Sequence, residues 1–441
     1  MSAEGRIESA VGVRPAAQYG GARAIGAAAI GNALEWYDFS VYALFAIYIA
    51  KTVFVGGNTV TALVRAFLVF GVGFIARPIG AIVLGAYADQ AGRRAALTLS
   101  LILMALGTLC IAVVPAYAAV GIAAPIVVLV GRLLQGLSAG GEIGGAVSFL
   151  VEHAPPGKRG RYASWLQASM AVSNILGAGV AAVLAYLLTV ESLTSWGWRV
   201  PFVLGLLIAP VGLWLRARLD ETPAFEAARR DQRTSGPLLK PVVDLLKEEP
   251  RALGAAAGAS IVWVCAVYTF VFFLPTYAQR TLGYTPSQAF TASVIGNIVM
   301  AIACIASGRL ADRIGPLRTV RWGALLLLVC PLPVVAWIGD VRTEAALIAG
   351  QTFLCLIVAV FAGSAPAMLA SLFPTRLRSS GVSLGYNFAA TVFGGFTLAI
   401  LTSLTEGHGY RLAPAGYVVV AAAVSLAILY TVRSQAVERT A

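Results

Sequence analysis

Hydrophobic residues follow one another along this chain in long runs, and short polar segments separate the runs. Each run reaches about the 20 apolar residues that a helix needs to cross the hydrocarbon core of a bilayer. The pattern therefore predicts an all-α membrane protein with twelve transmembrane helices. They are expected at residues 24–50, 63–88, 95–115, 122–151, 162–188, 198–215, 252–278, 287–310, 320–338, 345–373, 380–404 and 413–432.

A long polar segment between the sixth and seventh of these helices carries both signs of charge and no apolar run. It divides the chain into two bundles of six helices. The expected organisation is a tail, a first bundle, a linker, a second bundle and a tail, at residues 1–23, 24–215, 216–251, 252–432 and 433–441. The first tail contains Arg6, Arg14 and Arg23 but no short apolar core with a cleavage site, so we do not interpret it as a signal peptide.

The two bundles repeat one another. Residues 85–94 read Gly-Ala-Tyr-Ala-Asp-Gln-Ala-Gly-Arg-Arg, and residues 308–315 read Gly-Arg-Leu-Ala-Asp-Arg-Ile-Gly, about half the chain later. A basic loop near Pro156 recurs near Pro374 at the same offset. Two six-helix pseudo-repeats of this kind are typical of secondary transporters, which bind their substrate between the halves near the middle of the bilayer.

Composition and charge agree with this picture. Of the 441 residues, 59% are hydrophobic and 12% are charged, about half the usual charged fraction of a soluble domain. The net charge of +12 does not indicate a nucleic-acid partner, because the basic residues gather in alternate loops, where they report topology. We expect those loops and both termini to be cytoplasmic, in a multi-pass protein of the inner (plasma) membrane.

Cofactor chemistry has little support in the sequence. His153 and His408 have no partner at the spacing of metal ligands, so we expect no metal and no cofactor. The five cysteines all fall within apolar runs, where a free cysteine behaves as a small hydrophobe. No nucleotide-binding or nucleophile motif is present, so we do not expect an enzyme. The expected partners are a small-molecule substrate, protons and the lipid bilayer, with the protein as a monomer.

Ionisable residues inside the predicted helices are the candidate coupling groups. An ionised side chain at bilayer depth costs at least about 2.5–3.5 kcal/mol and usually has a function. Glu35 and Asp38 share one face of the first helix, and Glu142 lies in the fourth, so all three are candidates for carrying protons. A buried carboxylate takes up a proton readily unless an arginine lies beside it. The alternative is that Glu35 or Asp38 forms a structural ion pair with Arg77 of the second helix.

Arg132 and Gln135, one turn apart in the fourth helix, are candidates for binding substrate. A guanidinium group recognises a carboxylate through two parallel hydrogen bonds. The alternative is that Asp38 or Glu142 occupies Arg132. The cores of helices seven to eleven carry no acid or base but several neutral polar residues, among them Tyr268, so we expect the second half to shape a pocket. Further pocket candidates are Tyr37, Gln167, Tyr386 and Asn387.

Several stretches resemble known transporters over essentially the whole chain. Residues 85–94 and their half-copy resemble the cytoplasmic gating motif of the major facilitator superfamily. The stretches that resemble its metabolite:proton symporter family are Gly-Asn-Ala-Leu-Glu-Trp-Tyr-Asp-Phe at 31–39, Arg-Leu-Leu-Gln-Gly at 132–136 with Gly-Gly-Glu at 140–142, Trp-Gly-Trp-Arg-Val-Pro-Phe at 196–202 and Asp-Glu-Thr-Pro-Ala-Phe at 220–225. The resemblance implies the major facilitator fold and a gating latch whose candidate residues are Asp89, Arg93, Arg94, Asp312 and Arg313, with Arg77 as an ion-pair partner.

The same resemblance implies proton-coupled uptake of an organic anion by alternating access. Residues 48–54, 77–85 and 121–136 are most similar to the citrate/tricarballylate branch, which favours a di- or tricarboxylate such as citrate. A zwitterionic osmolyte such as proline or betaine is the alternative, as is an aromatic or shikimate-like acid. The osmolyte branch typically adds a long charged tail, whereas this chain ends shortly after Arg433. Leu398 stands where related carriers often have proline, which leaves a kink in the eleventh helix open.

Overall fold

The computed structural model describes residues 21–91, 93–217 and 240–432, and helices occupy all twelve predicted positions. In the first half, the principal helices are α1 (Gly21–Val53), α2 (Thr59–Ala91), α3 (Arg93–Val113), α5 (Ala123–Ala139), α6 (Glu142–Glu152), α7 (Arg159–Leu187) and α9 (Val200–Ala217). Short helical turns in the connecting loops are α4 (Tyr117–Val120), α8 (Val190–Ser195) and η3 (Gly197–Arg199).

The second half follows the same plan with more interruptions. Its elements are α11 (Lys240–Glu248), α12 (Pro250–Val267), η4 (Tyr268–Phe273), α13 (Leu274–Arg280), α14 (Pro286–Ile314), α15 (Pro316–Val329), α16 (Pro331–Val341), α17 (Glu344–Ala362), α18 (Ala365–Ser371), α19 (Thr375–Ala389), η5 (Ala390–Gly394), α20 (Gly395–Thr402), η6 (Ser403–Gly407) and α21 (Ala413–Thr431). The elements η4, η5 and η6 are π-helical turns inside the seventh and eleventh predicted helices. The eleventh helix is thus interrupted even though Leu398 replaces proline.

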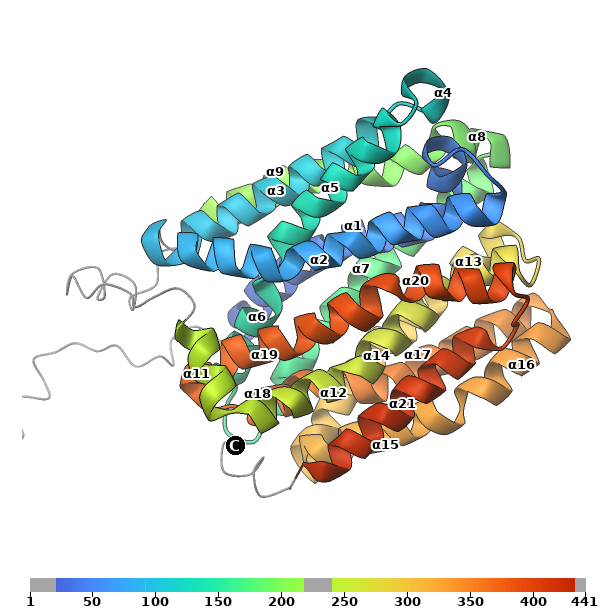
Figure 1. Ribbon diagram of the computed structural model, residues 1–441. Helices are drawn as coiled ribbons and strands as arrows, with labels where there is room; N and C mark the ends of the chain where they lie inside the picture. The colour runs from blue at the N-terminus through green and yellow to red at the C-terminus, as the bar shows by residue number, and fades with distance from the viewer. Residues whose placement is uncertain (1–20, 92, 218–239, 433–441) are drawn as a thin grey trace, which may run out of the picture.

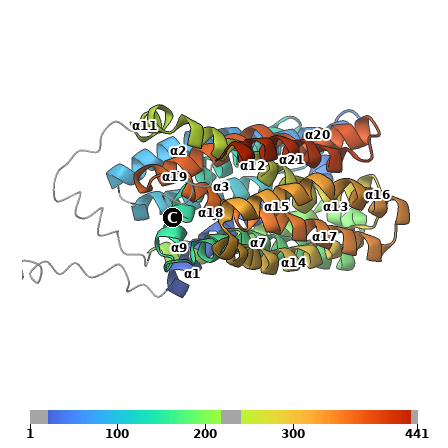
Figure 2. The same cartoon turned by 90° about the horizontal axis from the view of Figure 1, so that it is seen from below.

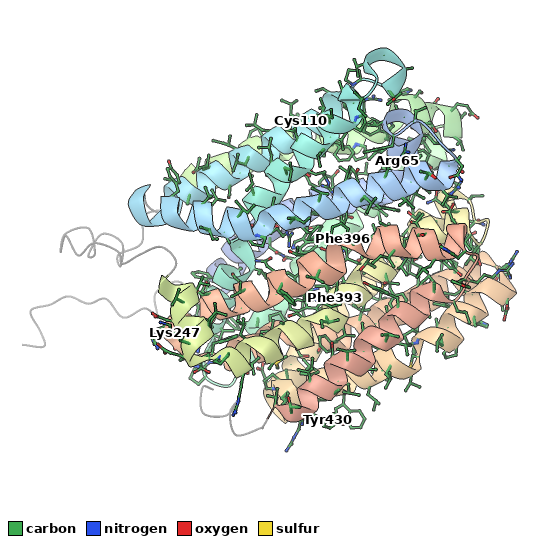
Figure 3. All side chains as sticks on the ribbon, viewed as in Figure 1. Arg65, Cys110, Lys247, Phe393, Phe396 and Tyr430 are labelled. Atoms are coloured by element: carbon green, nitrogen blue, oxygen red, sulfur yellow. The ribbon has the colours of Figure 1, made fainter. Side chains whose placement is uncertain are left out.

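Two bundles of roughly parallel helices lie side by side, α1 to α9 above and α12 to α21 below in the view of Figure 1. The view from below in Figure 2 shows that the helices run in one common direction. Along the seam, α7 packs against α14 and α2 packs against α20. Phe396 of α20 is labelled at this seam in Figure 3, beside α2. The seam is therefore formed by helices that are far apart in the sequence.

The bundle has two ends. We call the end with α11, α18 and the first turn of α7 the basic end, because the predicted basic loops lie there, and the end with α4, α8 and α16 the opposite end.

In the described part of the chain, eight continuous helical stretches are long and apolar enough to cross a membrane, and the bent pair α15–α16 makes a ninth. Large apolar side chains such as Val183 and Ile302 remain 56% and 68% exposed. Such exposure is expected where helices face lipid.

The fourth predicted helix shows how sequence and packing interact. It crosses as one span, Ala123–Glu152, but a turn at Gly140 and Gly141 separates α5 from α6. Glycine is a poor helix former because its backbone loses the most freedom on folding. A Cβ atom on Gly140 would lie 2.0 Å from the carbonyl oxygen of Arg77 in α2. The glycine that weakens the helix is thus also required by the close approach of α2.

Glycine pairs wedge α5 between α2 and α3. A Cβ atom on Gly136 would lie 1.8 Å from the carbonyl oxygen of Gly73, and one on Gly131 would lie 2.7 Å from that of Gly107. Small residues of this kind let helix backbones approach closely in membranes, where no hydrophobic effect drives helices together. Because Arg132 and Gln135 lie among these glycines, the same contacts hold both side chains close to α2 and α3.

We expect Gly136→Ala to destabilise the protein strongly, because the added methyl group meets the backbone of Gly73 rather than a side chain that can move. Gly145→Ala is the matched control, since a Cβ atom on that helical glycine meets nothing within 4 Å. The control should melt at or slightly above the wild-type temperature, as a helical glycine costs about 0.5–1 kcal/mol relative to alanine. Thermal unfolding in detergent measures both, and equal melting temperatures would contradict this account.

Candidate functional site

Four ionisable side chains from three helices gather inside the first half. They are Glu35 and Asp38 of α1, Arg77 of α2 and Arg132 of α5, and we call them the ionic cluster. Their exposed fractions are 6%, 5%, 2% and 1%. With all four ionised, the cluster contains two positive and two negative charges and is neutral as a whole. Charges this deeply buried must be paired and hydrogen-bonded.

Glu35 pairs with Arg77. The Nη2 atom of Arg77 donates to Oε1 of Glu35 at 3.2 Å, and both side chains are almost fully buried. Of the alternatives left open by the sequence, the structure therefore contains the ion pair between Glu35 and Arg77. Breaking a buried pair from one side leaves an uncompensated charge, which makes each partner dependent on the other.

Asp38 and Arg132 are linked through Gln135. The Thr108 hydroxyl of α3 donates to Oδ2 of Asp38, and Nε2 of Gln135 donates to Thr108 at 3.0 Å and to the same Asp38 oxygen at 3.5 Å. On its other side, Oε1 of Gln135 accepts from Nη1 of Arg132 at 2.5 Å. Gln135 is thus the partner of Arg132 in this structure, where the sequence had suggested Asp38 or Glu142. Thr108 was not a candidate, since a single threonine in an apolar helix has no distinguishing pattern.

Aromatic rings surround both guanidinium groups. We call Trp36, Phe39, Tyr42, Phe70, Phe74 and Tyr268 the aromatic cage. The guanidinium carbon of Arg77 lies 4.5 Å from the ring centre of Phe74, and that of Arg132 lies 4.1 Å from the ring centre of Tyr42. Phe39 lies 5.0 and 5.1 Å from the two arginines. Ring faces attract cations, so the cage stabilises both positive charges.

Several polar atoms of this region have no hydrogen-bond partner among the described residues. They include Oδ1 of Asp38, Nε of Arg77, Nη2 of Arg132 and the hydroxyl of Tyr268. An unpaired buried polar group costs about 1–3 kcal/mol, so native proteins keep few of them without a reason. Their concentration in one cluster marks the place where a polar ligand would gain most hydrogen bonds.

Tyr37 and Gln167, both pocket candidates, have their polar ends engaged elsewhere. The Tyr37 hydroxyl donates to the carbonyl oxygen of Pro201 at 3.0 Å, which ties α1 to α9. The Gln167 amide lies 3.9 Å from the sulfur of Met170 in its own helix. Asn32, by contrast, orients the cage, because it accepts from the Trp36 indole at 3.1 Å while donating to Ser169 of α7 at 2.8 Å.

Tyr386 and Asn387 of α19 reach across from the second half. The Tyr386 ring packs edge-on against Trp263 with 5.0 Å between the ring centres, and its hydroxyl lies beside the Arg77 guanidinium. Asn387 donates to the carbonyl oxygen of Gly140 at 2.9 Å, at the interruption between α5 and α6. Glu142 lies just beyond that interruption, half-buried, about 15 Å along the helix from Arg132 at 1.5 Å per residue.

At the basic end, Asp312 joins the two halves. Its carboxylate accepts from the backbone N–H groups of Gly160 and Arg161 at 2.6 and 3.0 Å, in the first turn of α7. Such N–H groups have no partner within the helix, and the helix dipole favours a negative charge there. Gly308, the first residue of the repeated motif, permits this close approach, since a Cβ atom there would lie 2.6 Å from the Gly160 carbonyl oxygen.

The other latch candidates contribute less to this picture. Arg313 is exposed, next to Asp312. The side chains of Asp89, Arg93 and Arg94 lie outside the described residues, although Asp89 belongs to the last turn of α2 and both arginines to the first turn of α3.

Two ion pairs among the described residues lie at the ends of the seam, and the sequence does not predict them because loop charges by themselves report only topology. Arg378 donates to Glu152 at 3.1 Å between α19 and α6, which are in different halves. At the opposite end, Arg280 donates to Glu406 at 2.8 Å and to the Thr59 hydroxyl of α2 at 3.3 Å. Both ends of the seam therefore carry polar contacts between the halves.

Comparison with known proteins agrees with the helical architecture. The sequence profile of the Major Facilitator Superfamily matches residues 28–399. The chain belongs to the Major Facilitator Superfamily. A citrate-proton symporter of Klebsiella pneumoniae is 36% identical over 98% of this chain and 97% of its own. A proline/betaine transporter of Escherichia coli (strain K12) is 32% identical over 94% of this chain and 84% of its own.

The solved structures share the fold. The proton:xylose symporter XylE, bound to 6-bromo-6-deoxy-D-glucose, superposes with a TM-score of 0.70 over 92% of this chain and 94% of its own, at 15% sequence identity. These comparisons confirm the predicted fold class, two six-helix halves of a major facilitator, and the resemblance to its citrate-proton symporters. The protein is a multi-pass membrane transporter and not an enzyme.

Within this transporter, we expect Glu35→Gln and Arg77→Met each to lower thermal stability by several degrees, because each leaves the partner charge buried and unpaired. Breaking a buried pair costs about 3–5 kcal/mol in soluble proteins. The double variant should recover much of the loss. Arg376→Met is the control, since the pair of Arg376 with Glu248 is 59% and 46% exposed and such pairs contribute about 0–1 kcal/mol. Additive losses in the double variant would contradict the pairing.

Proposed function

We propose that this transporter is a proton symporter that imports an organic anion, a di- or tricarboxylate such as citrate. The observation that carries the proposal is Arg132, a buried guanidinium group with one unpaired nitrogen, linked through Gln135 to the carboxylate of Asp38. The planar donor pair of arginine matches a carboxylate. A relative that covers nearly the whole chain is a citrate-proton symporter, which supports this class of substrate.

Charge balance gives the coupling. The ionic cluster is neutral when all four groups are ionised, so an added substrate carboxylate leaves it with excess negative charge. Excess charge is expensive in a buried site, and a proton on one of the carboxylates removes it. In this mechanism the substrate takes the Arg132 donors, Gln135 turns away, and Asp38 accepts a proton at its oxygen. Glu35, tied to Arg77, is the second proton site, and Glu142 is the release site towards the basic end.

Alternating access requires that the two halves, residues 24–215 and 252–432, rock about the site as units. We assign the basic end to the cytoplasm, with both termini inside and one chain as the working unit. Two contacts hold the cytoplasmic end closed: the hydrogen bonds of Asp312 to the first turn of α7 and the ion pair of Arg378 with Glu152. Asp89, Arg93, Arg94 and Arg313 complete this latch. Arg280 and Thr59 close the outer end. Tyr386 and Asn387 complete the pocket from the second half.

A second candidate substrate is a zwitterion such as proline or betaine. The aromatic cage favours it, because stacked rings bind quaternary ammonium groups, and a proline/betaine transporter is among the relatives. In this structure, however, the rings already face the guanidinium groups of Arg77 and Arg132. An aromatic or shikimate-like acid would place one carboxylate on Arg132 and its ring in the cage. We rank both below a polycarboxylate.

Uptake by the purified protein in proteoliposomes tests the proposal. Labelled citrate should accumulate above its external concentration when the outside is made acidic, and an uncoupler should abolish the accumulation. Unlabelled tricarboxylates should compete, whereas betaine, proline and shikimate should not. Citrate uptake that ignores the proton gradient would refute symport, and competition by betaine alone would transfer the proposal to the osmolytes.

We expect Asp38→Asn to lose gradient-driven accumulation by tenfold or more while retaining exchange of internal for external citrate. Exchange needs substrate binding and alternating access but no net proton movement, and asparagine cannot release a proton. Asp340→Asn is the matched control, because it makes the same chemical change at an exposed position in α16. If Asp38→Asn still accumulates citrate under a proton gradient, Asp38 is not the proton site.

A further inference from the structure

Tyr268 brings a buried hydroxyl group from the second half of the transporter to the ionic cluster. Its side chain is 0% exposed, and its hydroxyl has no hydrogen-bond partner among the described residues. Three charged groups of the first half, Arg77, Glu35 and Arg132, lie near this hydroxyl, as does the hydroxyl of Tyr386 from the second half. The sequence identifies Tyr268 only as one of several neutral polar residues expected to shape the pocket.

The ring of Tyr268 is held within the aromatic cage. Its centre lies 5.5 Å from that of Phe74, 6.2 Å from that of Phe70 and 6.5 Å from that of Trp36, with the two phenylalanines edge-on. Edge-to-face contacts of this kind fix the orientation of a ring. The hydroxyl is therefore presented at one place in the cage and does not sweep through it.

Two π-helical turns provide the space for this ring. Tyr268 is the first residue of η4, and η5 of the eleventh helix ends at Gly394. A Cβ atom on Gly394 would lie 3.1 Å from the Tyr268 ring, which is tighter than most side chains tolerate. Single π-helical turns within α-helices often occur at functional sites. Here they lie where two helices of the second half meet the cage.

A purely structural role does not account for the hydroxyl. Two other buried tyrosines place their hydroxyl on a backbone carbonyl: Tyr42 on Ala66 at 3.0 Å and Tyr277 on Arg411 at 2.8 Å. A phenylalanine at position 268 would keep the ring contacts and avoid burying an unpaired polar group. The retained hydroxyl is explained by a partner that binds between the halves.

We propose that the Tyr268 hydroxyl donates a hydrogen bond to a carboxylate of the substrate whose other contacts are Arg132 and Arg77. This inference rests on the proposed function and adds a specificity-determining residue to it. Arg77 and Arg132 offer only donors to this space. Glu35 and Tyr386 also lie near the Tyr268 hydroxyl, but neither accepts its hydrogen bond, so we assign the acceptor to an anionic or strongly polar group of the substrate. A substrate held in this way contacts both halves at once, which is what closing the halves around it requires.

Tyr268→Phe tests the inference, with citrate binding and transport measured on the full-length purified protein. A hydrogen bond to a charged group corresponds to about tenfold to a hundredfold in affinity. We expect the apparent Kd and KM for citrate to rise by that factor, with accumulation at saturating citrate still driven by the proton gradient. The ligand-free variant should melt at or above the wild-type temperature, since it no longer buries an unpaired hydroxyl.

Two controls separate this role from packing. Tyr277→Phe makes the same change at a hydroxyl that bonds to the backbone, so it should lower the melting temperature and leave citrate affinity unchanged. Thr269→Val removes another buried, unpaired hydroxyl from the same π-helical turn, and it should leave affinity unchanged.

Wild-type citrate affinity in Tyr268→Phe overturns the inference, as does a loss of stability without a loss of affinity. If citrate binding depends on Tyr268 but citrate uptake does not respond to the proton gradient, symport is refuted and the inference about Tyr268 stands. Absence of citrate binding by the wild-type protein overturns both, because the acceptor for Tyr268 is then not a citrate carboxylate.

Discussion

The burial of two arginines with two carboxylates is the constraint on which the rest of this transporter depends. The four side chains, Glu35, Asp38, Arg77 and Arg132, are almost completely buried. The cluster is neutral when all four are ionised. A buried ionic group is tolerated when it is paired and fully hydrogen-bonded, yet several polar atoms here lack a partner. The cluster is therefore stable enough to exist and incomplete enough to respond to an anion and a proton. In the proposed mechanism, coupling between the anion and the proton follows from electroneutrality.

The rings and helices around the cluster stabilise its charges and hold its side chains in place. Aromatic rings stabilise the guanidinium groups from their faces and leave the donors in the guanidinium plane available. Glycine pairs bring α5 against α2 and α3, so that Gln135 reaches Thr108 and Asp38 while Arg132 stays within the cage. Close helix packing thus determines where the charges lie, since a bulkier residue at Gly136 would move the helix that carries Arg132.

The seam between the halves contains polar contacts at both ends and near the cluster. Polar contacts cross it at the basic end through Asp312 and Arg378, and at the opposite end through Arg280. Near the cluster, Tyr386 and Tyr268 approach from the second half, which has no acid or base in the cores of helices seven to eleven. In the proposed mechanism the halves therefore have different tasks. The first holds the charges that exchange partners, and the second supplies neutral groups that contact the substrate without altering the charge balance.

The sequence by itself determined the helices, the repeat and the identity of the ionic residues. These follow from local rules, because a helix in lipid satisfies its own backbone and needs a run of apolar residues, in which a charge stands out. It also predicted that Glu35 and Asp38 share one face of the first helix, since helical periodicity fixes which side chains of a helix lie together.

Only the tertiary structure decided the partners. The partner of each side chain depends on how its helix is rotated and how closely that helix approaches its neighbours. Examples are the pair of Arg77 with Glu35, the position of Gln135 between Arg132 and Asp38, and the hydrogen bond of Tyr37 to Pro201. Glycine contacts between residues far apart in the sequence set those rotations. No pattern within one helix encodes them, because the atom that a side chain meets belongs to a different helix.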